Sequence, residues 1–239
     1  MAWGVDTLLG NGLLGLPVGL VIAAAVALAA YRKSDSVALA MSHARPADPV
    51  RYARLHNMVE GLCIAAGLPK PRVYVIDDPA PNAFATGRNP RHAAITVTTG
   101  LLDKMNRIEL EGVLAHELSH VKNSDVLVST LAVTLVGLPS LVLVPLFAPV
   151  MQLAVSRRRE SLADVNGVEL TRYPPGLISA LEKLKGDTTV VRFNSRATAH
   201  LWIESPLARD PEGGRLSWLN RMFDTHPPLD ERIRALKEL

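Results

Sequence analysis

The sequence has few aromatic residues, a single cysteine and two long stretches without any charge. Phe, Trp and Tyr make up 5% of the chain, whereas hydrophobic residues make up 48%. The lone Cys63 cannot form an internal disulfide, which agrees weakly with a reducing compartment. The mean hydropathy of +0.17 is high for a water-soluble protein. Together these features indicate a chain that contacts a membrane.

A nucleic-acid partner is not expected, although the net charge is +3 and the pI is near 9.2. The chain lacks a basic stripe interleaved with aromatic residues, and it lacks any nucleic-acid fingerprint. Its basic residues gather beside apolar segments instead, as in Tyr31–Lys33 and Arg157–Arg159. This distribution is typical of a membrane surface.

The first uncharged stretch runs from Leu8 to Ala30 and would rise about 34 Å as a helix, enough to cross a bilayer. Ala27–Ala29 resembles a signal-peptide cleavage site, but Asp6 precedes the stretch and no Lys or Arg does, so the basic n-region is missing. We therefore predict a transmembrane helix over 8–30. Arg32 and Lys33 follow it, and the positive-inside rule places the remaining chain in the cytoplasm. The protein is expected to be integral to the inner or plasma membrane.

Residues 31–239 are predicted to form one domain of the α+β class, mainly α with a small β-sheet. A helix is expected from Asp48-Pro49 to about residue 66. Strands are expected over Arg72–Asp77 and Ala93–Thr98, with a loop over 79–90 between them. This sheet is expected to lead directly into a helix whose start carries a capping box.

That helix contains His116-Glu117-Leu118-Ser119-His120, an HExxH pattern. Asn106 is its candidate N-cap, with Glu109 three residues on. Positions i and i+4 of a helix share one face, so His116 and His120 can bind one zinc ion while Glu117 reaches a water on it. A third ligand is then required from elsewhere in the chain.

The second uncharged stretch, 126–155, is predicted to be a hydrophobic helical hairpin that interrupts the domain. If the third ligand lies beyond it, the chain must return to the side of the membrane on which it started. A turn near Gly137–Pro139 places Glu160 opposite Glu117, which selects Glu160 as a metal ligand. Each arm is short for a bilayer, so the hairpin could span, dip into the membrane, or form the core of a soluble domain.

Glu160 begins the segment Glu160-Ser161-Leu162-Ala163-Asp164, which puts two carboxylates on one helical face. One carboxylate can bind the metal. The other, Asp164, is suited to accept a hydrogen bond from the second ring nitrogen of a ligand histidine.

Several motifs together resemble the membrane zinc metalloproteases of the HtpX type and the CAAX-prenyl-protease type, which are gluzincins. The resemblance covers roughly 47–239 and is specific, because the motifs occur in the same order. The chain has one N-terminal span and a compact hairpin, whereas the usual bacterial members have two spans and a longer second hydrophobic region. The matching segments are Pro81–Gly87, Thr99–Leu102, His116–His120, Glu160–Asp164 and Thr225–Arg232.

The resemblance implies one zinc ion per chain, bound by His116, His120 and Glu160. It implies that the histidine of the T-H-P-P segment, His226, approaches the site as an oxyanion donor. It also implies that an edge strand over about Ala93–Thr98 and the asparagine loop line the substrate cleft, where an extended peptide could add by main-chain hydrogen bonds. The residues of that loop are Asn82, Ala83, Phe84, Ala85, Thr86 and Gly87.

The function expected from these residues is zinc-assisted peptide hydrolysis, with Glu117 as the general base. The resemblance favours misfolded or damaged membrane proteins as polypeptide substrates, cleaved at the cytoplasmic face of the bilayer. Two alternatives stay open. One is a selective processing peptidase of the prenyl-protease type, and the other is a non-catalytic membrane scaffold that binds zinc structurally. The segment 186–214 is a candidate lid whose apolar patch could be either a docking surface or core.

Overall fold

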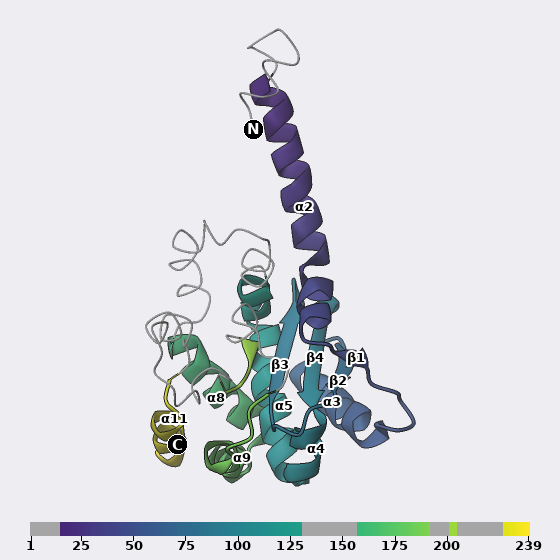
Figure 1. The fold of residues 1–239 in the computed structure, drawn as a ribbon. Helices are drawn as coiled ribbons and strands as arrows, with labels where there is room; N and C mark the ends of the chain where they lie inside the picture. Colours follow the sequence, from purple (N-terminus) through teal and green to yellow (C-terminus); the bar gives the residue numbers. More distant parts are fainter. Residues whose placement is uncertain (1–14, 131–156, 192–200, 205–226) are drawn as a thin grey trace.

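The computed structural model describes residues 15–130, 157–191, 201–204 and 227–239, and it is mainly helical with one small mixed sheet (Figure 1). This confirms the predicted balance of helix and sheet. Helix α2 (Gly15–Met41) rises away from the sheet in Figure 1 and overlaps much of the predicted span 8–30. Within the described ranges, however, no helix is long and apolar enough to cross a membrane. The predicted transmembrane helix is therefore not confirmed.

The first helix of the domain starts later than predicted. Helix α3 spans Ala53–Ala66 and ends at Gly67, whose φ of 67° is the left-handed conformation that glycine adopts readily. Asp48 was expected to cap this helix directly. Its carboxylate instead accepts hydrogen bonds from the backbone N–H groups of Val50 and Arg51, at 3.0 and 2.7 Å. The Asp-Pro pair thus closes a turn that precedes the helix.

The sheet has four strands in the order β1-β2-β4-β3. They are β1 (Arg45–Pro46), β2 (Arg72–Ile76), β3 (Ala83–Gly87) and β4 (Ala93–Thr98). Strand β4 pairs in parallel with β2 and antiparallel with β3. The two predicted strands are present, but two predictions about this region were wrong. Residues 83–87 form a buried strand rather than a loop. Strand β4 lies inside the sheet, and the strand at the edge next to it is β3.

A short helix, α4 (Thr99–Lys104), separates β4 from the helix that carries HExxH, so the sheet does not lead directly into that helix as predicted. Thr98 caps α4 by accepting a hydrogen bond from the N–H of Leu101 at 3.1 Å. Gly100 lies so close to the preceding loop that a Cβ there would come within 2.1 Å of the Pro79 carbonyl oxygen. This contact holds the start of α4 against the end of β2.

Helix α5 (Arg107–Lys122) carries the HExxH residues and is the core of the domain. The capping box is confirmed: the Asn106 side chain accepts from the N–H of Glu109, and Glu109 accepts from the N–H of Asn106. The same carboxylate also accepts hydrogen bonds from Ser179 and Lys183, at 2.7 Å each. Burial opposes its ionisation, but these hydrogen bonds hold the pKa of Glu109 below its ordinary value.

Of three later helices, the first two pack against α5, and the third packs against the first two. They are α8 (Arg157–Thr171), α9 (Pro174–Gly186) and α11 (Leu229–Lys237), and they lie together on one side of the molecule in Figure 1. Two glycines allow the close approach. A Cβ on Gly112 of α5 would lie 2.8 Å from the backbone N of Leu177, and one on Gly167 of α8 would lie 3.0 Å from the backbone N of His116.

Helix α5 does not continue into the predicted hairpin. It ends at Lys122, and Ser124 adopts a φ of 60° before a further helical segment over 125–130. The chain therefore changes direction between the helix that carries HExxH and the uncharged stretch. The greater part of the predicted hairpin, from residue 131 onward, lies outside the described residues.

The described part of the candidate lid, 201–204, belongs to the core. Leu201, Trp202 and Ile203 are buried, and the Trp202 ring packs edge-on against Phe84 with centroids 4.7 Å apart. The N–H of Ile203 donates to the carbonyl of Ala83 at 2.9 Å. This segment is thus fastened to β3.

Candidate metal centre

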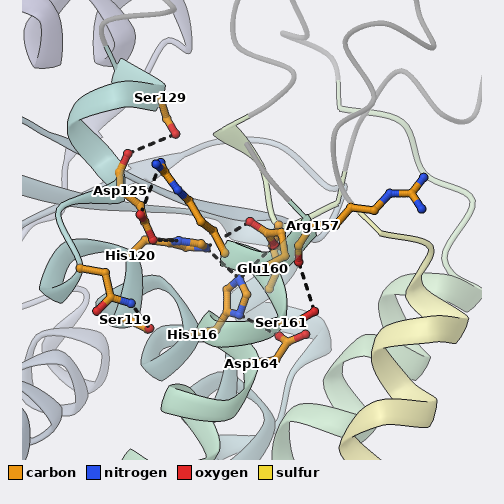
Figure 2. A network of polar contacts seen from close by, with 12 residues as sticks. His116, Ser119, His120, Asp125, Ser129, Arg157, Glu160, Ser161 and Asp164 are labelled. Atoms are coloured by element: carbon orange, nitrogen blue, oxygen red, sulfur yellow. Dashed lines mark hydrogen bonds and ion pairs between the residues drawn. The ribbon is translucent and has the colours of Figure 1, made fainter. Parts of the chain in front are cut away.

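His116 and His120 lie one turn apart on α5, and both side chains point toward α8 (Figure 2). Their Nε2 atoms are 3.2 Å apart, and the rings are nearly perpendicular at 86°. His116 is fully buried, while His120 keeps slight exposure. The two histidines that the sequence predicted as ligands therefore present the same ring nitrogen to one point.

Glu160, on the first turn of α8, faces that point from the opposite side. Its Oε1 lies 3.4 Å from Nε2 of His120, and its Oε2 lies 3.6 Å from Nε2 of His116 (Figure 2). All three ligand atoms lie within 4.8 Å of one another. Two ligands of a tetrahedral zinc ion, each about 2.05 Å from the metal, are about 3.3 Å apart. The separations in the structure therefore fit a small tetrahedral cation.

Two carboxylates orient the histidines so that Nε2 is the free ligand atom. Nδ1 of His116 lies 2.9 Å from Asp164, and Nδ1 of His120 lies 3.3 Å from Asp125. Each Nδ1–H donates to its carboxylate, which leaves Nε2 as the ring nitrogen available to bind a metal ion. The hydrogen-bond partners therefore define the tautomer of each ring.

The charges around the site stabilise the ionised form of Asp164. Burial opposes its ionisation, but the Arg232 charge and hydrogen bonds from His116 and Arg232 lower its pKa to about 2. The pKa of His120, in contrast, is raised. Burial disfavours its charged form, yet Glu160, Asp125 and Glu117 together raise the pKa of His120 to about 9. The site is therefore an anionic environment that favours a bound cation.

The sequence analysis missed Arg232, which comes from α11 and is buried at 3% exposure. Its Nε and Nη2 atoms donate to the two oxygens of Asp164 at 2.9 and 2.7 Å. Nη2 of Arg232 is also 3.4 Å from Nδ1 of His116. The contact of Nδ1 with Asp164 is shorter, at 2.9 Å, so Nδ1 donates to Asp164 rather than accepting from Arg232. The spacing of the sequence could have indicated that this arginine is buried. Arg232 lies on the same helical face as the apolar residues Leu229, Ile233 and Leu236.

Asp125 was also missed. It follows the break after α5, and its second oxygen lies 3.5 Å from Nη1 of Arg159. Because the chain turns at Ser124, helical spacing could not place Asp125 beside His120. The predicted contact of Asp164 with a ligand histidine, by contrast, is present in the structure.

Glu117, the predicted general base, lies on α5 beside His116 and is 2% exposed. Its charge acts on the site, because it contributes to the raised pKa of both His120 and Arg232. His226, the predicted oxyanion donor, lies outside the described residues.

The six predicted substrate-binding residues, 82–87, lie in or next to β3, which packs against α5. Asn82 is fixed at both ends: its N–H donates to the Thr98 hydroxyl, and its side-chain amide donates to the carbonyl of Glu204 at 2.9 Å. Phe84 and Thr86 are fully buried. The structure thus places this strand beside the HExxH helix α5, while most of its side chains are buried in the core.

Residues 49–239 match the model of "Peptidase family M48". Curated relatives named "Protease HtpX homolog" are similar over nearly the whole chain. One from Thermoanaerobacter pseudethanolicus is 41% identical, covering 88% of this chain and 80% of the relative. One from Tropheryma whipplei is 43% identical, covering 92% of this chain and 84% of the relative. One from Streptococcus thermophilus is 38% identical, covering 100% of this chain and 91% of the relative.

Among solved structures, the chain is similar to S. mikatae Ste24p, with a TM-score of 0.55 and 20% sequence identity. The match covers 97% of this chain and 60% of the Ste24p chain. At this identity the likeness shows a shared fold.

Proposed function

Since the chain belongs to peptidase family M48 and is a metalloendopeptidase, we propose that its metal is zinc, held by His116, His120 and Glu160. The observation that carries this proposal is the cluster of possible ligand atoms: the two Nε2 atoms are 3.2 Å apart, and the Glu160 carboxylate lies 3.4 Å from Nε2 of His120 through Oε1 and 3.6 Å from Nε2 of His116 through Oε2. Two imidazole nitrogens and one carboxylate are the ligands of many catalytic zinc sites, which keep a fourth position open. A structural zinc site in a non-catalytic scaffold would instead fill all four positions.

Zinc in this position would lower the pKa of a coordinated water and polarise the scissile carbonyl. The residues of the chain would carry out the proton transfers. Glu117 accepts a proton from the attacking water and returns it to the leaving amine. Asp164 keeps His116 in the tautomer that exposes Nε2, and His226 supplies a hydrogen bond to the oxyanion.

We further propose that the substrates are misfolded or damaged membrane proteins, cleaved at the cytoplasmic face. The support is the uncharged stretch over 8–30 followed by Arg32 and Lys33, together with the high identity to relatives named as HtpX proteases. Selective processing of a lipidated peptide is the alternative. A peptide library with apolar, lipidated and unmodified members separates the two, because a strict requirement for the lipid would contradict a quality-control role.

The role of Glu117 is tested by Glu117→Gln, an isosteric change that removes the base but keeps the shape of the site. The variant should retain bound zinc, measured by elemental analysis, while cleavage of an unfolded polypeptide falls by at least about 10²-fold. Glu111→Gln is the matched control, because Glu111 lies on the same helix and is half-exposed. It should cleave at the wild-type rate. Substantial turnover by Glu117→Gln would rule out its role as the base.

A further inference from the structure

Arg232 contacts two parts of the molecule that the metal site must align. On one side, its Nε and Nη2 atoms bind both oxygens of Asp164, which in turn accepts from Nδ1 of His116 at 2.9 Å. On the other side, its Nη1 atom donates to the carbonyl of Ile203 at 3.1 Å. A single buried guanidinium thus links a metal ligand to the segment 201–204.

The segment 201–204 is itself fixed to the edge strand β3. The N–H of Ile203 donates to the Ala83 carbonyl, and Asn82 donates through its side-chain amide to the carbonyl of Glu204, both at 2.9 Å. Trp202 packs on Phe84 from the same direction. Both backbone polar groups of Ile203 are therefore held, one by β3 and the other by Arg232. A continuous chain of contacts runs from His116 through Asp164, Arg232 and Ile203 to Ala83.

The contacts at position 232 can be made by an arginine but not by a lysine. Within the described ranges, Arg232 is the only Lys or Arg that is buried, and it lies 3.8 Å from Oε2 of Glu160 as well as against Asp164. Its planar fork presents donors in two directions at once, whereas a lysine offers one compact charge. A lysine could keep an ion pair with Asp164 but could not reach the carbonyl of Ile203 at the same time.

We propose that Arg232 is a positioning residue that couples the metal ligand His116 to the edge strand β3, by holding Asp164 and the Ile203 carbonyl together. The inference rests on the proposed zinc site. It means that metal binding and the geometry of the β3 edge are linked, so each stabilises the other. Arg232 acts through its hydrogen bonds to Asp164 and to the Ile203 carbonyl.

The first test needs no substitution. Hydrogen exchange of the Ile203 and Glu204 amides is measured in the full chain with and without added zinc. Coupling predicts that zinc slows exchange at these amides by about fivefold or more, beyond any change in helix α3, whose residues form no hydrogen bond or ion pair with Arg232. If zinc binds and exchange at 201–204 changes no more than in α3, the proposal is overturned.

The second test compares Arg232→Lys with Arg234→Gln, an exposed position on the same helix. Arg232→Lys should weaken zinc binding by about tenfold, raise KM more than it lowers kcat, and abolish the effect of zinc on exchange at 201–204. Asp164→Asn should weaken zinc binding by about 10–100-fold while Arg232 still holds Ile203. Arg234→Gln should match the wild type in every measurement.

The outcomes separate the two proposals. Wild-type behaviour of Arg232→Lys in zinc affinity, KM and exchange would overturn the role of Arg232 and leave the zinc site intact. Failure of the wild-type chain to bind zinc would overturn the proposed function and this inference together. If Arg232→Lys does not fold, the comparison of the wild-type chain with and without zinc still decides.

Discussion

At the scale of single residues, the pair His116 and His120 is arranged so that something positive must lie between the rings. Their Nε2 atoms are 3.2 Å apart, and two lone pairs at this distance would repel. Without a metal ion, a proton can take that position. The pKa of His120, raised to about 9 against the cost of burial, means that this proton is bound at neutral pH.

Zinc must displace the proton on His120, so zinc affinity should fall in acid. With a pKa of about 9, the apparent affinity should weaken by about tenfold for each pH unit below 9, or about 100-fold from pH 8 to pH 6. Competition with a chelator of known pH dependence measures this change. An affinity that stays constant between pH 6 and pH 8 would contradict the raised pKa.

The raised pKa of His120 also determines how the stability of the metal-free protein depends on pH. The folded pKa of His120 lies above the ordinary value of 6.5. In the metal-free protein, the stabilisation from this proton is therefore fully present below about pH 6.5 and is lost as the pH rises through about 9. Metal-free protein should accordingly become less stable in mild alkali as far as this group is concerned.

The sequence predicted those site residues whose relation is local, and it missed those that depend on packing. HExxH fixes two histidines through helical spacing alone, and Asp164 follows from its position one turn after Glu160. The pairing of Glu160 with His116 came from an assumed turn near residue 138, a region outside the described residues. Arg232 lies 116 residues after His116 in the sequence. No rule based on helical spacing could therefore predict that it contacts the site.

At the scale of helices and strands, the site depends on how closely α8 and α9 approach α5. Gly112 is the point of contact with α9, and a Cβ there would lie 2.8 and 3.0 Å from two backbone atoms of Leu177. Backbone cannot move aside as a flexible side chain can. The helix pair must therefore separate to accommodate any larger residue.

Gly112→Ala should lower the free energy of unfolding by about 1–3 kcal/mol, even though alanine favours helix by about 1 kcal/mol. Gly61→Ala in α3 is the matched control, because nothing lies within 4 Å of its Cβ position. It should stabilise the protein by about 0.5–1 kcal/mol. Urea unfolding of both variants measures the difference. Equal effects of the two substitutions would show that α5 and α9 are not in tight contact.

Strand β3 shows why local pattern was insufficient at this scale. Its residues, Ala83-Phe84-Ala85-Thr86-Gly87, are mostly small and follow a proline and an asparagine, which together favour a loop. They form a strand because β4 pairs with them and α5 covers them. The neighbouring β4, rich in β-branched residues, was predicted with its correct bounds. Tertiary packing therefore decided the conformation where intrinsic preference was weak.

At the scale of the whole molecule, the site is a junction of three helices that are distant in the chain. α5 supplies two histidines, α8 supplies Glu160 and Asp164, and α11 supplies Arg232. A ligand that binds only this junction stabilises the folded state by mass action. Metal removal should therefore loosen the molecule as a whole.

Zinc at about 100 times its dissociation constant should add about 2.7 kcal/mol, which raises Tm by about 5–10 °C. Thermal unfolding with zinc and with excess chelator measures the shift. His116→Asn should abolish it, whereas His92→Asn, at an exposed histidine that is not among the proposed ligands, should keep it. An unchanged Tm after metal removal would show that the junction does not depend on the metal.

The contribution of Arg232 from α11 also bears on when the enzyme becomes active. Proteins are synthesised from the N-terminus, and α11 follows all the other described elements in the chain. Until α11 emerges from the ribosome and docks, Asp164 has no guanidinium partner and the Ile203 carbonyl is not held. A growing chain that already contains HExxH and Glu160 therefore lacks a finished site. The order of synthesis therefore places the completion of the site after every other described element has been made.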